Sequence, residues 1–229
     1  MMHLFWLLYD MGYSCQINNR VLEEKDENRY CKSTLSYFRF TFDYLVGTNQ
    51  LQFLIWNIIL ALIPFDLALL IRYFKKYRLV QILITIVWLV FFPNAMYMVT
   101  DFSHLSSIGT GLMTETQFFN YAILAVGVLT GLILGISSAH IVGRVYCQKL
   151  STVWTIMFYV VLSFVSAYGI YLGRFLRINS WEIVSDPQKV IKLFMASISM
   201  HSLVFVISFG ALQFALLVLY HMVRRINID

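Results

Sequence analysis

Charged residues are scarce in this chain. They make up 13% of the sequence, hydrophobic residues make up 59%, and the mean hydropathy is +0.72. Soluble domains carry about 25% charged residues, so this composition excludes an ordinary soluble domain. Most of the 229 residues lie in apolar runs of roughly 20 residues, each long enough to cross a bilayer core of about 30 Å. The sequence therefore predicts an all-α integral membrane protein, a polytopic bundle of transmembrane helices.

Cysteines and known catalytic motifs are also few. Cys15, Cys31 and Cys147 have neither CxxC spacing nor an even count, so they predict neither a zinc knuckle nor a disulfide framework. The chain contains no serine elbow, P-loop or HExxH motif. The net charge of +5 arises from basic residues in short loops, where they set topology. We therefore expect no cofactor and no nucleic-acid partner.

Five apolar runs are candidates for membrane spans. They cover about residues 51–74, 79–101, 118–142, 152–176 and 198–220. Residues 1–50 precede them as a polar and interfacial segment, so the predicted division is 1–50 and a transmembrane domain 51–229. The five-span arrangement places the basic residues of this first segment outside the cytoplasm, and a sixth crossing within residues 1–47 is the alternative that relieves this.

Lys and Arg residues are distributed unevenly over the two sides of the five-span arrangement. Cytoplasmic loops of membrane proteins carry an excess of these residues. After the first span, one side holds Arg174, Arg177, Lys189 and Lys192, and the other holds Arg72, Lys75, Lys76, Arg78, Arg144, Lys149, Arg224 and Arg225. We therefore predict a multi-pass protein of the cell membrane in which the end of the second span and Arg174 lie on the extracytoplasmic side.

The end of the second predicted span carries polar residues directly after Pro93. Asn94, Tyr97, Asp101 and His104 are spaced three, four and three residues apart, which places them on one side of a helix that resumes after the proline. A carboxylate that faces hydrocarbon is costly, so this side is expected to face protein or water. Asp101 and His104 are therefore the strongest functional candidates in the sequence.

Polar residues from three other places converge on the same side of the membrane. Asn57 lies about two turns inside the first span, Arg174 and Arg177 leave the fourth, and His201 enters the fifth. Two guanidinium groups one helical turn apart can hold the same phosphate or carboxylate. This convergence predicts a polar cleft that opens on the extracytoplasmic side.

The functional hypothesis treats Asp101 and His104 as a catalytic acid/base pair, because a carboxylate can orient an imidazole. The substrate would be anionic and lipid-linked, and membrane lipids would be the natural partners. The substrate would undergo phosphoryl, glycosyl or acyl chemistry, or be bound without reaction. The predicted binding residues are Asn57, Asn94, Arg174, Arg177, Asn179 and Glu182.

A structural interpretation and a metal site are the alternatives. In the first, Arg174 pairs with Asp101, and this ion pair links two helices of a non-catalytic membrane scaffold. In the second, Asp101 and His104 share one metal ion with His201 or Glu182. Transport is disfavoured, because the ionisable residues other than Asp66 crowd one leaflet and the two halves show no repeat.

The third predicted span carries a stripe of small residues. Gly127, Gly131, Gly135, Ala139 and Gly143 follow one another at intervals of four residues. Such a stripe lets another helix approach closely, since packing drives helix association in lipid. It favours contact within the chain, and the alternative is oligomerisation through Gly127, Gly131 and Gly135.

Three segments together resemble a known family. They are FLIWNIILALIP at 53–64, FPNAMYMVTDFSHL at 92–105 and YLGRFLRINSWE at 171–182. In this order they resemble the bacterial membrane proteins catalogued as domain of unknown function 1361. The resemblance implies a multi-pass bacterial membrane protein without an assigned activity. It supports as site residues Asn57, Asn94, Asp101, His104, Arg174, Arg177, Asn179 and Trp181.

The chain departs from this family at two positions. It has Phe118, Phe119 and Asn120 where the family often has Trp-Tyr-Asp, so an acid there is not essential here. Glu182 stands where the family usually has Asp, which keeps the charge and moves it by one methylene. Residues 1–50 lie outside the resemblance.

Overall fold

The computed structural model describes residues 52–108, 113–147, 151–177 and 185–224. The predicted segment 1–50, with its alternative sixth crossing, lies outside the described residues. The same is true of Asn179, Trp181 and Glu182.

Within the described ranges the chain is almost entirely helical and contains no strand, which confirms the predicted fold class. Five helical segments, Leu54–Lys76, Arg78–His104, Glu115–Cys147, Thr152–Phe175 and Met200–Val223, are long and apolar enough to cross a membrane. In chain order the elements are α3 (Gln52–Tyr73), η1 (Phe74–Lys76), α4 (Arg78–Tyr97), η2 (Met98–His104), α5 (Leu105–Ile108), α6 (Glu115–Cys147), α7 (Thr152–Phe175), α9 (Pro187–Ala196) and α10 (Met200–Val223).

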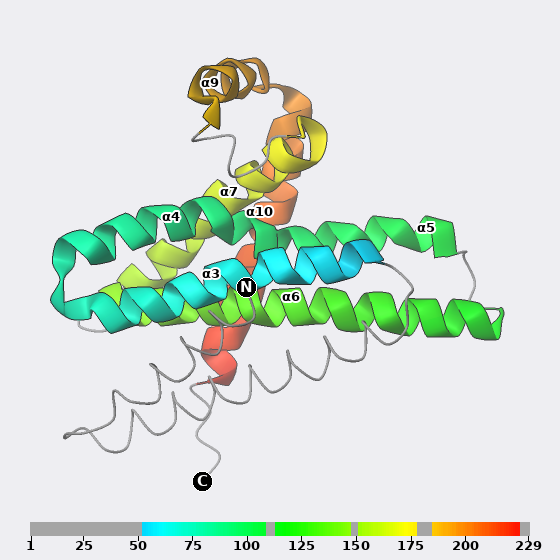
Figure 1. Cartoon of the computed structure of the whole chain (residues 1–229), viewed down its shortest axis with the longest axis horizontal. Helices are drawn as coiled ribbons and strands as arrows, with labels where there is room; N and C mark the ends of the chain where they lie inside the picture. The colour runs from blue at the N-terminus through cyan, green and yellow to red at the C-terminus, as the bar shows by residue number, and fades with distance from the viewer. Residues whose placement is uncertain (1–51, 109–112, 148–150, 178–184, 225–229) are drawn as a thin grey trace, which may run out of the picture.

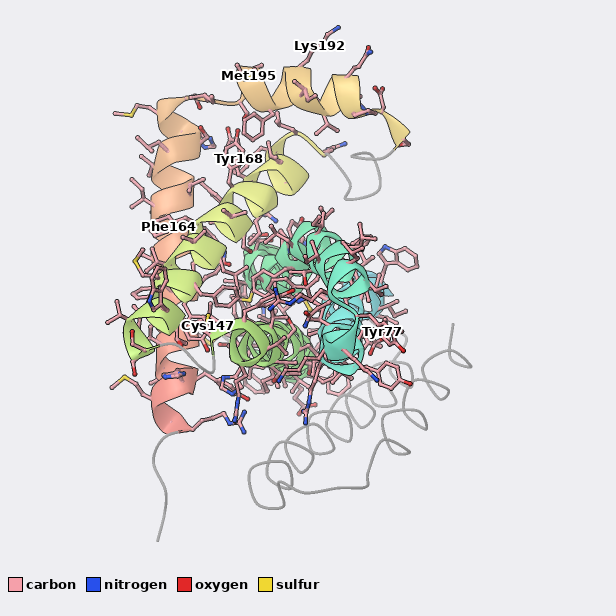
Figure 2. All side chains as sticks on the ribbon, turned by 90° about the vertical axis from the view of Figure 1, so that its left-hand side faces the viewer. Tyr77, Cys147, Phe164, Tyr168, Lys192 and Met195 are labelled. Atoms are coloured by element: carbon pink, nitrogen blue, oxygen red, sulfur yellow. The ribbon has the colours of Figure 1, made fainter. Side chains whose placement is uncertain are left out.

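Three of the long helices lie side by side. The short 3-10 turn η1 joins α3 to α4 in an antiparallel hairpin, and α6 runs back alongside both (Figure 1). On the other side of α4, α7 passes obliquely, and α10 packs against α7 and crosses the direction of α3, α4 and α6 (Figure 2). This order places η2 and the end of α7 near one another.

Large side chains fill the space between α3, α4 and α6. Phe65, Trp88, Phe92, Met96 and Ile123 are all fully buried there. Trp88 and Phe92 are one turn apart on α4, and their ring centroids lie 5.1 Å from each other. Because lipid is as apolar as these side chains, close packing rather than escape from water holds such helices together.

The small-residue stripe of α6 packs within the chain. A Cβ atom at Gly127 would overlap Leu54 of α3, and one at Gly131 would overlap Met98 of η2. At Gly135 it would press on Met96 and Ala95 of α4. The intramolecular interpretation of this stripe is therefore confirmed, and oligomerisation stays a prediction.

The helix that contains Pro93 does not break at the proline. It continues as α4 to Tyr97 and then tightens into a 3-10 segment, η2, from Met98 to His104. A 3-10 helix has about three residues per turn, so residues three apart in sequence stack along one line. In η2 this aligns Asp101 with His104, and Thr100 with Ser103.

Candidate functional site

Three helical elements meet around Asp101. Its side chain is only 2% exposed, and Oδ2 accepts a hydrogen bond of 2.7 Å from Asn57 Nδ2 on α3. A buried carboxyl group without a donor is costly, so this amide stabilises Asp101 in its position. The Asn57 side chain, about two turns inside the first span as the sequence indicated, thereby connects α3 to η2.

Arg174 reaches η2 from the last turn of α7. Its Nη1 donates to Thr100 Oγ1 at 3.0 Å, and its Nη2 donates to Ser103 Oγ at 2.8 Å. Thr100 Oγ1 in turn donates to the carbonyl of Tyr97 at 2.8 Å, which fixes its direction. Because the 3-10 turn stacks Thr100 and Ser103, one planar guanidinium group can bind both hydroxyls.

Arg174 does not pair directly with Asp101, so the ion pair predicted under the structural interpretation is wrong. Asp101 takes its hydrogen bond from Asn57, and Arg174 gives its two to the flanking hydroxyls. Arg174 still lies near enough for its charge to act on the Asp101 carboxyl group. We refer to these side chains as the Asp101–Arg174 cluster, which consists of Asn57, Thr100, Asp101, Ser103 and Arg174.

His104 and Asn94 lie on either side of this cluster along the chain. His104 follows Asp101 by one 3-10 turn, is exposed, and is close enough to interact electrostatically with that carboxyl group. Asn94 is half-buried in the last turn of α4. The structure therefore places the predicted acid/base pair on one line, with Asp101 inside and His104 at the surface.

Arg177 does not continue the helical face of Arg174. Helix α7 ends at Phe175, the N–H of Leu176 donates to the carbonyl of Leu172 at 3.1 Å, and Arg177 takes a left-handed conformation with φ of 54°. Such a conformation is common just after a helix and is costly for a residue other than glycine. The prediction of two guanidinium groups one helical turn apart is therefore wrong, and the Arg177 side chain is exposed beyond the helix.

His201 lies against α7 rather than against Asp101. Its Nδ1 lies 3.4 Å from the hydroxyl of Tyr171, and the edge of Phe175 meets its ring at a centroid distance of 4.9 Å. Tyr171 precedes Arg174 by three residues on α7, so His201 is adjacent to the cluster. In the described part of the chain, no three His, Cys, Asp or Glu side chains come together to hold a metal.

Sequence reasoning missed Thr100, Ser103 and Tyr171. All three belong to the segments that carried the family resemblance, and Thr100 directly precedes Asp101. Their hydroxyls contact Arg174 and His201 only because η2 is a 3-10 helix and α10 packs on α7. Neither fact follows from an apolar periodicity.

A second cluster of polar side chains lies between α6, α7 and α10, near the carboxyl-terminal ends of α6 and α10. His140 is buried there, with its Nδ1 3.5 Å from the hydroxyl of Tyr159 and its ring edge-on to Tyr220 at 5.5 Å. These contacts connect α6 to α7 and α10, and they involve none of the residues of the Asp101–Arg174 cluster.

The helices and the cluster together define a class of protein. Over the described residues it is a helical protein with five helices long and apolar enough to cross a membrane. Buried or half-buried polar side chains join three of its helical elements. The family model described as Protein of unknown function (DUF1361) matches residues 56–216, and the chain belongs to this family. This confirms the resemblance, and the matched region contains the whole cluster. No curated protein and no solved structure matches the chain.

Proposed function

We propose that the Asp101–Arg174 cluster binds the anionic group of a lipid-linked substrate at the extracytoplasmic side of a bacterial cell membrane. The observation that carries this proposal is the placement of Arg174. Two of its nitrogens are held on Thr100 and Ser103, beside an ionisable group that is buried among membrane-spanning helices. Ionisable residues in such surroundings are functional candidates by default.

The guanidinium group keeps capacity for a ligand. It has five N–H donors, and within the described residues it uses two of them, one on Nη1 and one on Nη2. A phosphate or carboxylate accepts two parallel N–H donors of arginine, which gives binding both strength and orientation. Arg174 is half-buried in the last turn of a candidate span, where a lipid headgroup can reach it from the bilayer surface.

Asp101 and His104 supply the means to modify such a substrate. Asn57 holds the Asp101 carboxyl group in place, and the exposed imidazole of His104 lies one 3-10 turn further toward the surface. An imidazole beside a carboxyl group is suited to take or give a proton at a bound substrate.

A non-catalytic membrane scaffold is the second candidate function. The same hydrogen bonds that support substrate binding also connect α3 and α7 to η2. Under this alternative the cluster serves stability alone, because polar side chains between membrane helices can act as contacts only.

Binding of lipid phosphate to the purified full-length protein separates the two candidates. We would measure binding of a polyprenyl phosphate by native mass spectrometry, with the corresponding polyprenol and inorganic phosphate as separate ligands. Arg174→Gln should weaken binding of the lipid phosphate by about 10-fold to 100-fold, since hydrogen bonds to charged groups contribute about 1.5–3 kcal/mol. Arg224→Gln, at the far end of α10, is the matched control and should bind like the wild type.

The pattern over the three ligands identifies what the cluster recognises. The proposal requires binding of the lipid phosphate and much weaker binding of polyprenol and of free phosphate. Equal binding of lipid phosphate by the Arg174→Gln variant and the wild type would rule the proposal out. If that variant lost thermal stability while the lipid phosphate failed to bind even the wild type, the scaffold would be the better account.

A further inference from the structure

Helix α9 is amphipathic and too short to cross a membrane. It has 10 residues, begins with Pro187, and is capped by Asp186, whose Oδ1 accepts from the N–H of Lys189 at 3.1 Å. At about 100° per residue, one broad face is apolar and the opposite face is polar. The apolar face carries Val190, Ile191, Leu193, Phe194 and Met195, the polar face carries Lys189 and Lys192, and Gln188 lies at the border beside Met195.

Contacts with α7 fix the position of α9. The hydroxyl of Tyr168 donates to the carbonyl of Phe194 at 3.2 Å and also contacts the hydroxyl of Ser197, and the Tyr168 and Phe194 rings meet edge to face at 5.0 Å. Figure 2 shows α9 lying across the ends of α7 and α10, with Lys192 pointing away from the rest of the protein. In the chain α9 follows α7 and directly precedes α10, so it lies on one side of the membrane, at the ends of both candidate spans, if these two helices cross it.

Two apolar side chains of α9, Ile191 and Met195, are largely uncovered by the described residues. None of its residues is buried, and Ile191 and Met195 are 62% and 66% exposed. Exposed apolar side chains follow α9 in the chain at Ile198 and Met200, 69% and 77% exposed, and at Val204 of α10. Because α10 presents those side chains to lipid if it spans the membrane, the same lipid is the occupant that fits the adjoining surface of α9.

We propose that α9 is a membrane-surface helix that lies in the headgroup layer of the leaflet where α7 ends and α10 begins. Ile191 and Met195 enter the upper part of the acyl chains, and Lys189 and Lys192 face the phosphates of anionic lipids. Amphipathic helices with apolar residues on one face and lysines on the other bind membranes in this way. This proposal is independent of the Asp101–Arg174 cluster.

Spin labels on the full chain in liposomes of phosphatidylcholine and phosphatidylglycerol test the orientation. The background carries Cys15→Ser, Cys31→Ser and Cys147→Ala, and single labels replace Ile191 and Met195 on the apolar side and Lys189 and Lys192 on the other. Labels at 191 and 195 should favour collision with oxygen over a water-soluble nickel chelate several-fold, and labels at 189 and 192 should show the reverse. Nickel access at all four positions would overturn the proposal, as would shielding of 191 and 195 from both reagents, which a second protein chain would cause.

Photo-crosslinking provides a second measurement that leaves the native cysteines in place. Met195→p-benzoylphenylalanine should crosslink to lipid in membranes, and Lys192→p-benzoylphenylalanine should do so several-fold less. Phosphatidylglycerol should be enriched among the lipids crosslinked at 195, and the enrichment should fall to the bulk composition in the Lys189→Gln, Lys192→Gln double variant. Crosslinks from 195 to protein alone, or an enrichment unchanged by the double variant, would overturn the proposal.

Discussion

At the scale of single residues, the position of Asp101 depends on one amide. The carboxyl group is buried in η2, and Asn57 supplies its hydrogen bond from α3 across 44 positions of sequence. A buried carboxyl group that loses its donor bears the cost of its desolvation, whereas removal of both partners leaves nothing unpaired. The two side chains should therefore act on stability as a unit.

A double-mutant cycle should show this coupling. We expect Asn57→Ala and Asp101→Ala each to lower the free energy of unfolding in detergent, with a coupling energy of about 1–3 kcal/mol between them. The comparison pair is Asn57→Ala with Arg174→Ala, two residues that share no hydrogen bond, and its coupling should be smaller. Additive effects for Asn57 and Asp101 would contradict the role assigned to this contact.

At the scale of helices, the packing of α7 on α4 depends on Gly169. A Cβ atom at this position would lie 2.7 Å from Cγ of Pro93. The proline ring is held in the backbone and cannot rotate away as a flexible side chain would. A larger residue at 169 would therefore push α7 away from α4. Because Arg174 is on α7, the same movement would draw it away from its hydrogen-bond partners on η2.

Gly169→Ala should destabilise the protein through this contact. Overpacking of a close interface costs about 1–3 kcal/mol, which we expect to appear as a lower melting temperature in detergent. The control is Val161→Ala on the same helix, where the side chain is 58% exposed and truncation should change stability by less than about 0.5 kcal/mol. Equal melting temperatures for Gly169→Ala and wild type would show that the two helices are not in close contact.

The helices themselves were predictable, and their local geometry was not. Hydrophobic length alone located all five candidate spans, because a bilayer sets the length of the helices that cross it. The partners of Arg174 were mistaken because η2 is a 3-10 helix, which brings Thr100 and Ser103 to the guanidinium group. Asn57 was singled out because an amide inside an apolar run needs a partner, and the sequence could not name Asp101 as that partner.

At the scale of the whole molecule, the two ends of α4 differ in their basic residues. The basic turn η1 lies at one end of α4, and η2 with α5 lies at the other (Figure 1). Lys75 and Lys76 occupy η1, whereas the described residues 98–108 contain no Lys or Arg. The positive-inside rule therefore predicts that η1 faces the cytoplasm and that α5 faces the opposite side.

Cysteine labelling in intact cells tests this orientation directly. Ser106→Cys on α5 and Lys76→Cys on η1 both replace exposed residues, and the two positions lie beyond opposite ends of α4. We expect a membrane-impermeant maleimide to label position 106 in intact cells and position 76 only after permeabilisation. Lys192→Cys on α9 should behave like position 106, because α7 and α10 place it at the same side as Arg174. Labelling of 76 and not 106 in intact cells would reverse the orientation, and the cluster would then take its anionic ligand from the cytoplasmic leaflet.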